Sequence, residues 1–133
     1  AAEANLDETD RADAKRAAYL CKADLVTNAV VEFTSVQGIM GSYYAEAAGE
    51  TPQVARAIAQ HYQPKFAGDA LADGTVGQLV AFADKLDTIC GLFAIDQGPS
   101  GSSDPFAIRR SAIGIVNMLN AGQSHRCDLM CAR

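Results

Sequence analysis

A loop rich in glycine and serine at 97–103 leads into a helix start that carries two adjacent arginines, Arg109 and Arg110. A loop of this kind presents free backbone N–H groups at the positive end of a helix dipole, where a phosphate group binds well. We therefore expect this segment to be the best candidate for nucleic-acid contact. The hydroxyls of Ser102 and Ser103, and the ammonium of Lys65 in another predicted loop, are further candidate phosphate contacts.

The same segment also suits a structural role. Asp104 stands where it would cap the following helix, so its carboxylate would occupy some of these N–H groups and repel an anion. Arg110 shares a helix face with Phe106 and Ile113, which fits packing or a buried ion pair. The residues alone leave phosphate contact and structural support as open alternatives.

Upstream of this loop, the segment 79–93 predicts a helix with two carboxylates. Apolar residues recur at helical spacing and form one stripe, which we expect to be buried: Leu79, Phe82, Leu86, Ile89 and Phe93. On this basis Leu86→Ala or Phe93→Ala should cost about 2–5 kcal/mol. Asp84 and Asp87 fall nearly opposite the stripe on a second apolar face, so both are candidates for burial. Alternatively, Asp87 is a structural acid paired with Lys85, Arg109 or Arg110.

The composition indicates a single globular domain. The 133 residues are 49% hydrophobic and carry a net charge of −5, which disfavours binding to nucleic acid or membranes by bulk electrostatics. Residues 1–103 hold 14 acids and 7 bases, whereas 104–133 hold 2 acids and 4 bases, so positive charge gathers near the end. No apolar run approaches the ~18 residues of a membrane span, and no secretory leader is visible. Cys21 and Cys90 lie in apolar helical patterns that are typical of reduced thiols. We expect a cytoplasmic protein, processed or cut from a longer chain.

The hydrophobic periodicity predicts helices throughout, and no segment shows sustained strand alternation, so the expected fold class is all-α. The expected helices are 10–33, 36–48, 52–62, 76–97 and 105–120, with caps at Thr9 or Asp10, Thr34, Thr51, Thr75 and Asp104. The apolar seams of the first and last are expected to be Tyr19, Ala23, Val26, Val30 and Phe33, and Ile108, Ala112, Ile115 and Leu119. Gly38 and Gly41 predict close helix packing, and Gly49 predicts a helix end.

Four segments carry a resemblance to a known family. The strings AAYLCKADLVTNAVVEFTSVQGIMGSYYAEAAGE, HYQPKFAGDAL, ADKLDTICGLFAI and GSSDPFAIRRSAIGIV resemble the β subunit of the bacterial heterotetrameric glycyl-tRNA synthetase. The resemblance covers roughly residues 12–120. It implies that 1–121 form an α-helical region related to the HD phosphohydrolase fold inside a longer subunit. Ser103 stands where the family usually has Lys, and 122–133 no longer resemble the family and form a divergent or disordered tail.

The HD relationship implies positions for a metal site, but an incomplete one. Asp24 follows Ala23 where HD enzymes have a His-Asp pair, His61 resembles a later motif histidine, and Asp84, with Asp87 close by, resembles the last metal-binding aspartate. Two expected histidines are missing, so the remaining ligands suit at most weak Mg²⁺ binding. We expect no catalytic residue and no metal in this chain.

Structural roles are open for the same residues. Asp24 and Asn28 fit the solvated face of the first helix, and His61 fits a capping or packing residue. His125, Cys127 and Cys131 are spaced like metal ligands near the end of the chain, which is a weak zinc signal.

The resemblance implies a non-catalytic part of an enzyme that charges tRNA-Gly. Its partners would be the α subunit, which uses ATP and Mg²⁺ for adenylation, and tRNA-Gly, with no DNA or membrane involved. This region would support tRNA binding or subunit architecture and would need no cofactor of its own. The alternatives are a metal-dependent HD-type phosphohydrolase and a structural spacer without a ligand.

Overall fold

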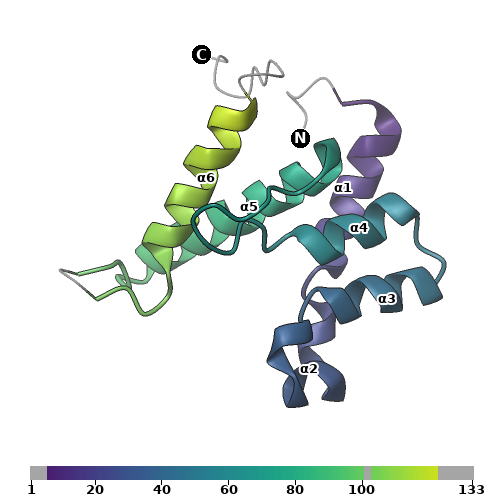
Figure 1. The fold of residues 1–133 in the computed structure, drawn as a ribbon, viewed down its shortest axis with the longest axis horizontal. Coiled ribbons are helices and arrows are strands. Elements are labelled where there is room, and N and C mark those ends of the chain that lie inside the picture. The colour runs from purple at the N-terminus through teal and green to yellow at the C-terminus, as the bar shows by residue number, and fades with distance from the viewer. Residues whose placement is uncertain (1–5, 101–102, 123–133) are drawn as a thin grey trace.

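The computed structural model describes residues 6–100 and 103–122, and these form helices joined by short turns and, after α4 and after α5, by longer connections (Figure 1). The elements are α1 (Glu8–Leu20), the 3₁₀ turn η1 (Ala23–Val26), α2 (Asn28–Glu32), the 3₁₀ turn η2 (Thr34–Val36), α3 (Ile39–Ala47), α4 (Pro52–Gln60), α5 (Gly74–Ala94) and α6 (Ile108–Gly122). Within the described residues there is no β-strand beyond an isolated bridge between Ser100 and Ser103. The all-α class is therefore confirmed.

The prediction of one long helix from residue 10 to Phe33 is wrong. Asp7, not Thr9 or Asp10, caps α1 by accepting the N–H of Asp10 at 2.7 Å, and α1 ends at Leu20. The chain then turns because the carboxylate of Asp24 reaches forward to backbone amides of a later turn. As a result the expected seam is largely exposed: Tyr19 at 81%, Val26 at 85% and Phe33 at 67%.

Glycine governs how α3 packs, as the sequence predicts. Gly38 precedes α3 with φ 80°, a conformation that favours glycine. Gly41 faces α4 so closely that an added Cβ would lie 2.9 Å from Cγ2 of Ile58 and 3.1 Å from Oδ2 of Asp24. The predicted start of α4 is also confirmed, since the Thr51 hydroxyl accepts the N–H of Val54 at 3.2 Å and Pro52 is the first helical residue.

Gly41→Ala is expected to lower the free energy of unfolding by about 1–3 kcal/mol, because the new methyl group has no room against Ile58. Gly91→Ala is the matched control, since its added Cβ, in the last turn of α5, meets nothing within 4 Å. Alanine should there stabilise the helix by up to about 1 kcal/mol. Urea unfolding of both variants measures the difference, and equal effects would contradict this packing of α3 on α4.

Helix α5 buries a different face from the predicted stripe. Its buried residues are Val76, Gly77, Val80, Ala81 and Lys85, whereas Leu86 is 44% and Phe93 is 56% exposed. The small side chains of the buried face allow α1 and α4 to approach closely, and this leaves the larger residues toward the outside. The helix begins at Gly74 with Asp73, not Thr75, at its N-cap position. The expected cost of 2–5 kcal/mol for Leu86→Ala or Phe93→Ala therefore does not hold for this chain.

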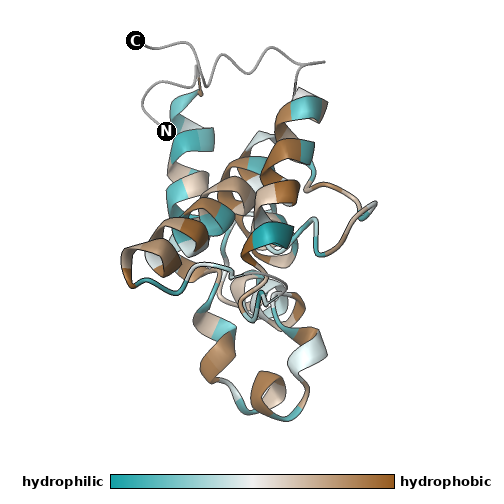
Figure 2. Cartoon of the chain, turned by 90° about the vertical axis from the view of Figure 1, so that its left-hand side faces the viewer, coloured by the Kyte–Doolittle hydropathy of each residue, from teal (hydrophilic) through white to brown (hydrophobic). Residues whose placement is uncertain are grey.

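The core lies where α1, α4 and α5 meet, and α6 packs along α5 (Figure 1). The larger cluster includes Ala17, Val54, Ile58, Val76 and Val80, and a second cluster joins Ala72 and Ala81 to Met118 of α6. In α6 the predicted seam holds for Ile108, which is 3% exposed, but Ala112 is exposed and Met118 is buried instead. The lower end of the molecule, near α2, carries hydrophobic residues on exposed helical turns (Figure 2).

Candidate functional site: a lysine-centred cluster beside a basic cleft

Asp24 is buried, so the interpretation that it lies on the solvated face of the first helix is wrong. The residue is 1% exposed, and its Oδ2 accepts the N–H groups of Gly38 at 2.6 Å and Gly41 at 3.0 Å. The hydroxyl of Thr27 donates to the carbonyl of Asp24 at 2.7 Å and holds the turn. The other carboxylate oxygen, Oδ1, is buried without a hydrogen-bond partner among the described residues. Asp24 therefore connects the turn after α1 to the start of α3.

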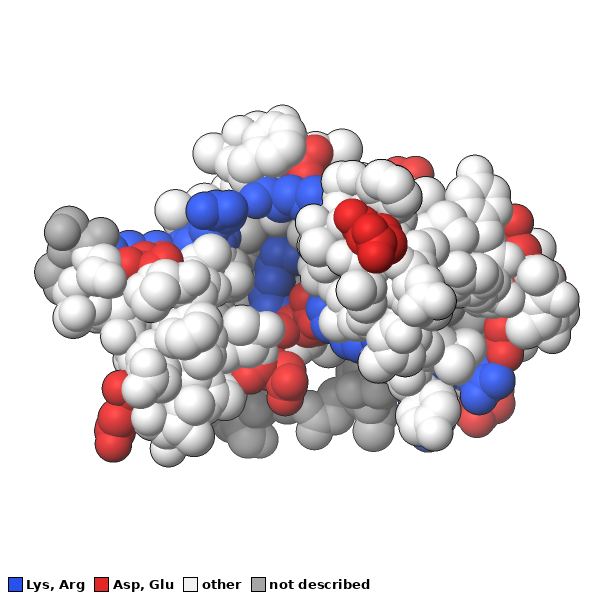
Figure 3. All heavy atoms as spheres, turned by 90° about the horizontal axis from the view of Figure 1, so that it is seen from below, with Lys and Arg blue, Asp and Glu red and all other residues white. Residues whose placement is uncertain are grey.

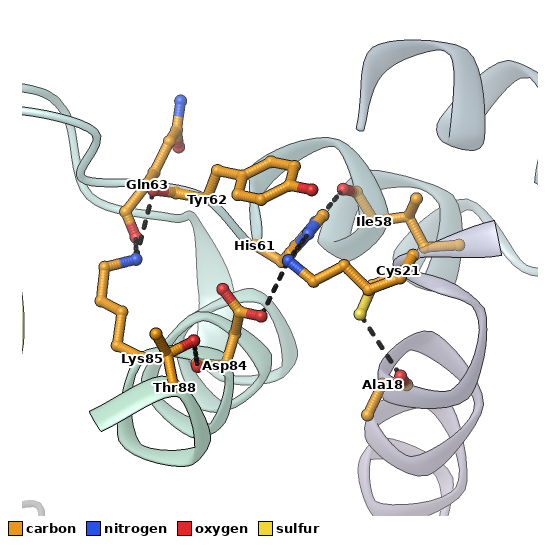
Figure 4. A network of polar contacts seen from close by, with 10 residues as sticks. Ala18, Cys21, Ile58, His61, Tyr62, Gln63, Asp84, Lys85 and Thr88 are labelled. Atoms are coloured by element: carbon orange, nitrogen blue, oxygen red, sulfur yellow. Dashed lines mark hydrogen bonds and ion pairs between the residues drawn. The ribbon is translucent and has the colours of Figure 1, made fainter. Parts of the chain in front are cut away.

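His61 and Asp84 meet at the ammonium group of Lys22. Nζ of Lys22 lies 3.0 Å from Nε2 of His61 and 2.9 Å from Oδ1 of Asp84. It also stands 3.9 Å from the centre of the Tyr62 ring, a cation–π contact. Nδ1 of His61 lies 2.7 Å from the carbonyl oxygen of Ile58, to which only an N–H can donate, so we assign the proton to Nδ1 and the lone pair to Nε2. Figure 4 shows His61, Tyr62 and Asp84 facing one another across this cluster.

The protonation states follow from burial and charge. Burial lowers the pKa of His61 to about 4, and the positive charge of Lys22 lowers it further. The hydrogen bond to the Ile58 carbonyl and the charge of Asp84 raise this pKa but do not outweigh the lowering. Burial alone would also lower the pKa of Lys22, but the hydrogen bond and charge of Asp84 outweigh it, so that the pKa is raised. At neutral pH the cluster therefore contains a neutral imidazole beside an ammonium.

The metal expected for an HD-type site does not fit these residues. The ammonium of Lys22 stands at the point on which His61 and Asp84 converge, and Oδ2 of Asp24 is taken by two amides. Within 6–100 and 103–122, no three His, Cys, Asp or Glu side chains are grouped so that they could hold a metal ion. Asp87, the fourth position named from the HD resemblance, is exposed on α5 and not buried as expected.

A cleft of about 470 Å³ lies directly beside this cluster. It brings Asp84, a position named from the HD resemblance, together with Lys65 and Arg110, which were named as phosphate contacts. Its walls come from the turn after α4, from α5 and from the start of α6, and its lining includes Lys65, Asp84, Lys85 and Arg110. Seen from below, the molecule has Lys and Arg side chains gathered around a hollow, with acidic side chains beside them (Figure 3). Lys65 and Arg110 are both exposed, and neither side chain has an ion-pair partner among the described residues.

Lys85 is a cleft residue that the sequence analysis did not single out as a site candidate. It is only 5% exposed, and its ammonium donates to the carbonyl oxygens of Tyr62 at 3.2 Å and Gln63 at 2.8 Å (Figure 4). Burial lowers its pKa. A lysine in the middle of a helix that is mostly apolar apart from Asp84 and Asp87 was the signal that could have identified it, because such a residue needs buried acceptors.

Arg109 borders a neighbouring cleft of about 330 Å³ that also includes Arg110 and Phe66. The start of α6 is not an open anion site, because the carboxylate of Asp104 accepts the N–H groups of Ile108 at 2.8 Å and Arg109 at 2.9 Å. Asp104 therefore occupies amides of the first helical turn as predicted, but α6 begins at Ile108 and not at Pro105. Ser103 is exposed and its N–H donates to the carbonyl of Ser100 at 2.8 Å.

Some candidate residues lie outside the part of the chain that the structure describes. These are Ser102, His125, Cys127 and Cys131. Cys21 is buried and donates to the carbonyl of Ala18, Cys90 is exposed, and both thiols are free. No described helix has the length and apolar character needed to cross a membrane.

The fold and the site define an all-α unit with an ion pair and a neutral histidine at its polar centre. This chain belongs to the glycyl-tRNA synthetase beta subunit family, whose sequence model matches residues 1–131. It is 54% identical over 116 residues to the glycine–tRNA ligase beta subunit of Methylobacillus flagellatus, which covers 87% of this chain. It is 56% identical over 110 residues, 83% of this chain, to that of Neisseria meningitidis serogroup C, and 54% identical over 114 residues, 86% of this chain, to that of Lacticaseibacillus casei. The matched region spans 16% of the length of each relative.

Proposed function

We propose that this chain is a helical region of the β subunit of a glycine–tRNA ligase, where it supports the charging of tRNA-Gly without catalysing a step itself. The complete enzyme would consume ATP with Mg²⁺ at an adenylation site on the α subunit. Family membership and the high identity to glycine–tRNA ligase beta subunits support the role in glycyl-tRNA synthesis. The α subunit and tRNA-Gly are the proposed partners, and the proposed location is the cytoplasm.

The cleft beside α6 is the observation that supports tRNA contact. The exposed, positively charged side chains of Lys65 and Arg110 line one concave surface, and the buried Lys85 is a third cation that lines the same cleft. Phosphate oxygens bind to such groups without regard to sequence, which fixes the position of an RNA backbone. Arg109 and Ser103, close to the same surface, are proposed as further contacts. Ser102 is kept as a proposed contact on its sequence position alone.

In the complete tetramer, Lys65→Ala combined with Arg110→Ala is expected to raise the KM for tRNA-Gly by roughly five- to thirtyfold. This corresponds to about 0.5–1 kcal/mol for each exposed charge contact. ATP–pyrophosphate exchange with glycine should be unchanged, because adenylation would take place on the other subunit. Lys15→Ala is the matched control, since it removes one exposed positive charge on α1, away from the cleft. Unchanged charging in an intact tetramer would exclude tRNA contact by the cleft and favour the structural spacer.

The alternative function, a metal-dependent HD-type phosphohydrolase, is disfavoured by the ammonium of Lys22. A divalent ion that activates water needs ligands with free lone pairs, and those of His61 and Asp84 are directed at a cation already in place. We expect no hydrolysis of phosphomonoesters, nucleotides or cyclic nucleotides with Mn²⁺ or Mg²⁺. Metal-dependent turnover that is lost in His61→Gln would contradict this expectation and support the phosphohydrolase.

A further inference from the structure

The cleft of about 330 Å³ beside α6 has an open aromatic ring among its lining residues. Phe66 lines this cleft and is 60% exposed. The loop that carries it is closed by Asp69, whose carboxylate accepts the N–H of Lys65 at 2.7 Å and whose own N–H donates to the carbonyl of Phe66 at 3.2 Å. Gly68 permits this turn with φ 83°. The ring is therefore presented to solvent by a hydrogen-bonded turn.

The same turn is packed closely against α6. Pro64 is buried, and a Cβ added to Gly114 of α6 would lie 3.4 Å from Cγ of Pro64 and 3.0 Å from Cε of Lys85. The absence of a side chain at Gly114 thus lets the turn lie against the helix. This packing places Phe66 in one cleft with Arg110 of α6.

Arg110 connects this cleft to the larger one of about 470 Å³. It lines both clefts, and Lys65, which directly precedes Phe66 in the chain, lines the larger one. A phosphate held by Lys65 and Arg110 therefore has the Phe66 ring in the adjoining cleft. Proteins that bind single-stranded nucleic acid combine cations along the backbone with aromatic rings on which bases stack. The two clefts offer this combination for one nucleotide.

We infer that the 330 Å³ cleft takes one unpaired RNA base, stacked on the Phe66 ring, while Lys65 and Arg110 hold the adjacent phosphate. A base inside a double helix has both faces covered by its neighbours, so only an unpaired base can offer a face to the ring. The carboxamide of Asn117, which also lines the cleft, can donate to and accept from a base edge. Asp104 lines it as well, but its carboxylate already accepts two backbone N–H groups. This inference rests on the proposed RNA contact of the larger cleft and adds the class of nucleotide that is bound.

The test is binding of a short single-stranded RNA, and of the same strand in a blunt-ended duplex, to the complete tetramer over a series of salt concentrations. Phe66→Leu should weaken binding of the single strand by roughly five- to thirtyfold, the lower part of the range for one stacked base, because leucine keeps some apolar contact. Duplex binding should change by less than about twofold, since its bases are not free to stack on the ring. The slope of log affinity against log salt should stay the same, because stacking releases no counterions.

Two further variants separate stacking from loss of an apolar side chain. Phe66→Tyr keeps an aromatic ring and should bind both RNAs like the unsubstituted enzyme. Phe33→Leu is the matched control, since Phe33 is 67% exposed and lines neither cleft. It should leave the binding of both RNAs unchanged.

Equal weakening of the single strand and the duplex by Phe66→Leu would overturn the inference, and so would unchanged binding of both. Loss of tetramer assembly in Phe66→Leu would also overturn it, because the ring would then pack on protein and not on RNA. The proposed phosphate contact fails by a different result, an unchanged salt slope for both RNAs when Lys65→Gln is combined with Arg110→Gln. A reduced slope in that double variant, together with no effect of Phe66→Leu, would leave the phosphate contact in place and exclude the base site.

Discussion

Asp24→Ala is expected to destabilise the chain by about 3–5 kcal/mol, the largest effect of any single polar substitution considered for this fold. The carboxylate of Asp24 accepts two backbone N–H groups, those of Gly38 and Gly41, and is 1% exposed. Removing it leaves both amides buried without an acceptor, at the turn where α3 begins. The free energy of unfolding in urea measures the loss.

Two control variants separate this role from a general effect of charge. Asp24→Asn keeps an acceptor oxygen for the amides and should cost less than half as much as Asp24→Ala. Asp87→Ala removes an exposed carboxylate from α5 and should change stability by no more than about 0.5 kcal/mol. A loss of less than about 1 kcal/mol in Asp24→Ala would show that this carboxylate does not hold the turn.

Acid is expected to weaken the fold through His61, by about 2–3 kcal/mol between pH 7 and pH 4.5. Burial lowers the pKa of His61 from 6.5 to about 4 in the folded chain. Above pH 6.5 the imidazole is neutral in both states and its full contribution is present. Between pH 6.5 and 4 the unfolded chain binds a proton that the folded chain does not bind, so stability falls as the pH falls.

The groups that face this imidazole are Lys22, Asp84 and Asp24, and a substitution of His61 alone leaves all three in place. His61→Gln keeps a donor for the Ile58 carbonyl and an acceptor for Lys22, but it does not titrate. Its stability should therefore fall about 2–3 kcal/mol less than that of the unsubstituted chain over the same pH range. Parallel pH profiles for the two proteins would mean that His61 is not buried in its neutral form.

The fold class and several helix ends could be predicted because their causes are local. The Thr51 and Pro52 start of α4 and the left-handed Gly49 after α3 each depend on neighbouring residues. The break after α1 could not be predicted in this way, because Asp24 is satisfied by amides at 38 and 41 and not by its own turn. A helical wheel assigns Asp24 to a polar face, whereas the three-dimensional contacts bury it.

The buried face of α5 was predicted wrongly for a related reason. Periodicity alone favoured the stripe with the larger side chains, whereas α1 and α4 pack on the smaller residues Val76, Val80 and Ala81. Both stripes have helical spacing, so the sequence pattern cannot distinguish them. The choice depends on how closely the neighbouring helices approach.

The candidate site was located in part by resemblance and completed only by the structure. Resemblance pointed to Asp24, His61 and Asp84, and the cluster does contain His61 and Asp84. It did not point to Lys22, whose role arises because the turn after α1, the end of α4 and the middle of α5 meet at its ammonium. Likewise, Lys65 was named from a predicted loop and Arg110 from the start of a predicted helix, and only the packing of α6 on α5 places them on one cleft.

The salt dependence of tRNA-Gly binding to the complete tetramer tests the proposed role of the cleft most directly. Each phosphate contact made by a lysine or arginine adds about 0.7–0.9 to the slope of log affinity against log salt. The tetramer with Lys65→Gln and Arg110→Gln should therefore show a slope shallower by about 1–2 than the unsubstituted enzyme, with weaker binding at low salt. Lys15→Gln should leave the slope unchanged. An intact double-variant tetramer with the same slope and affinity as the unsubstituted enzyme would contradict the account.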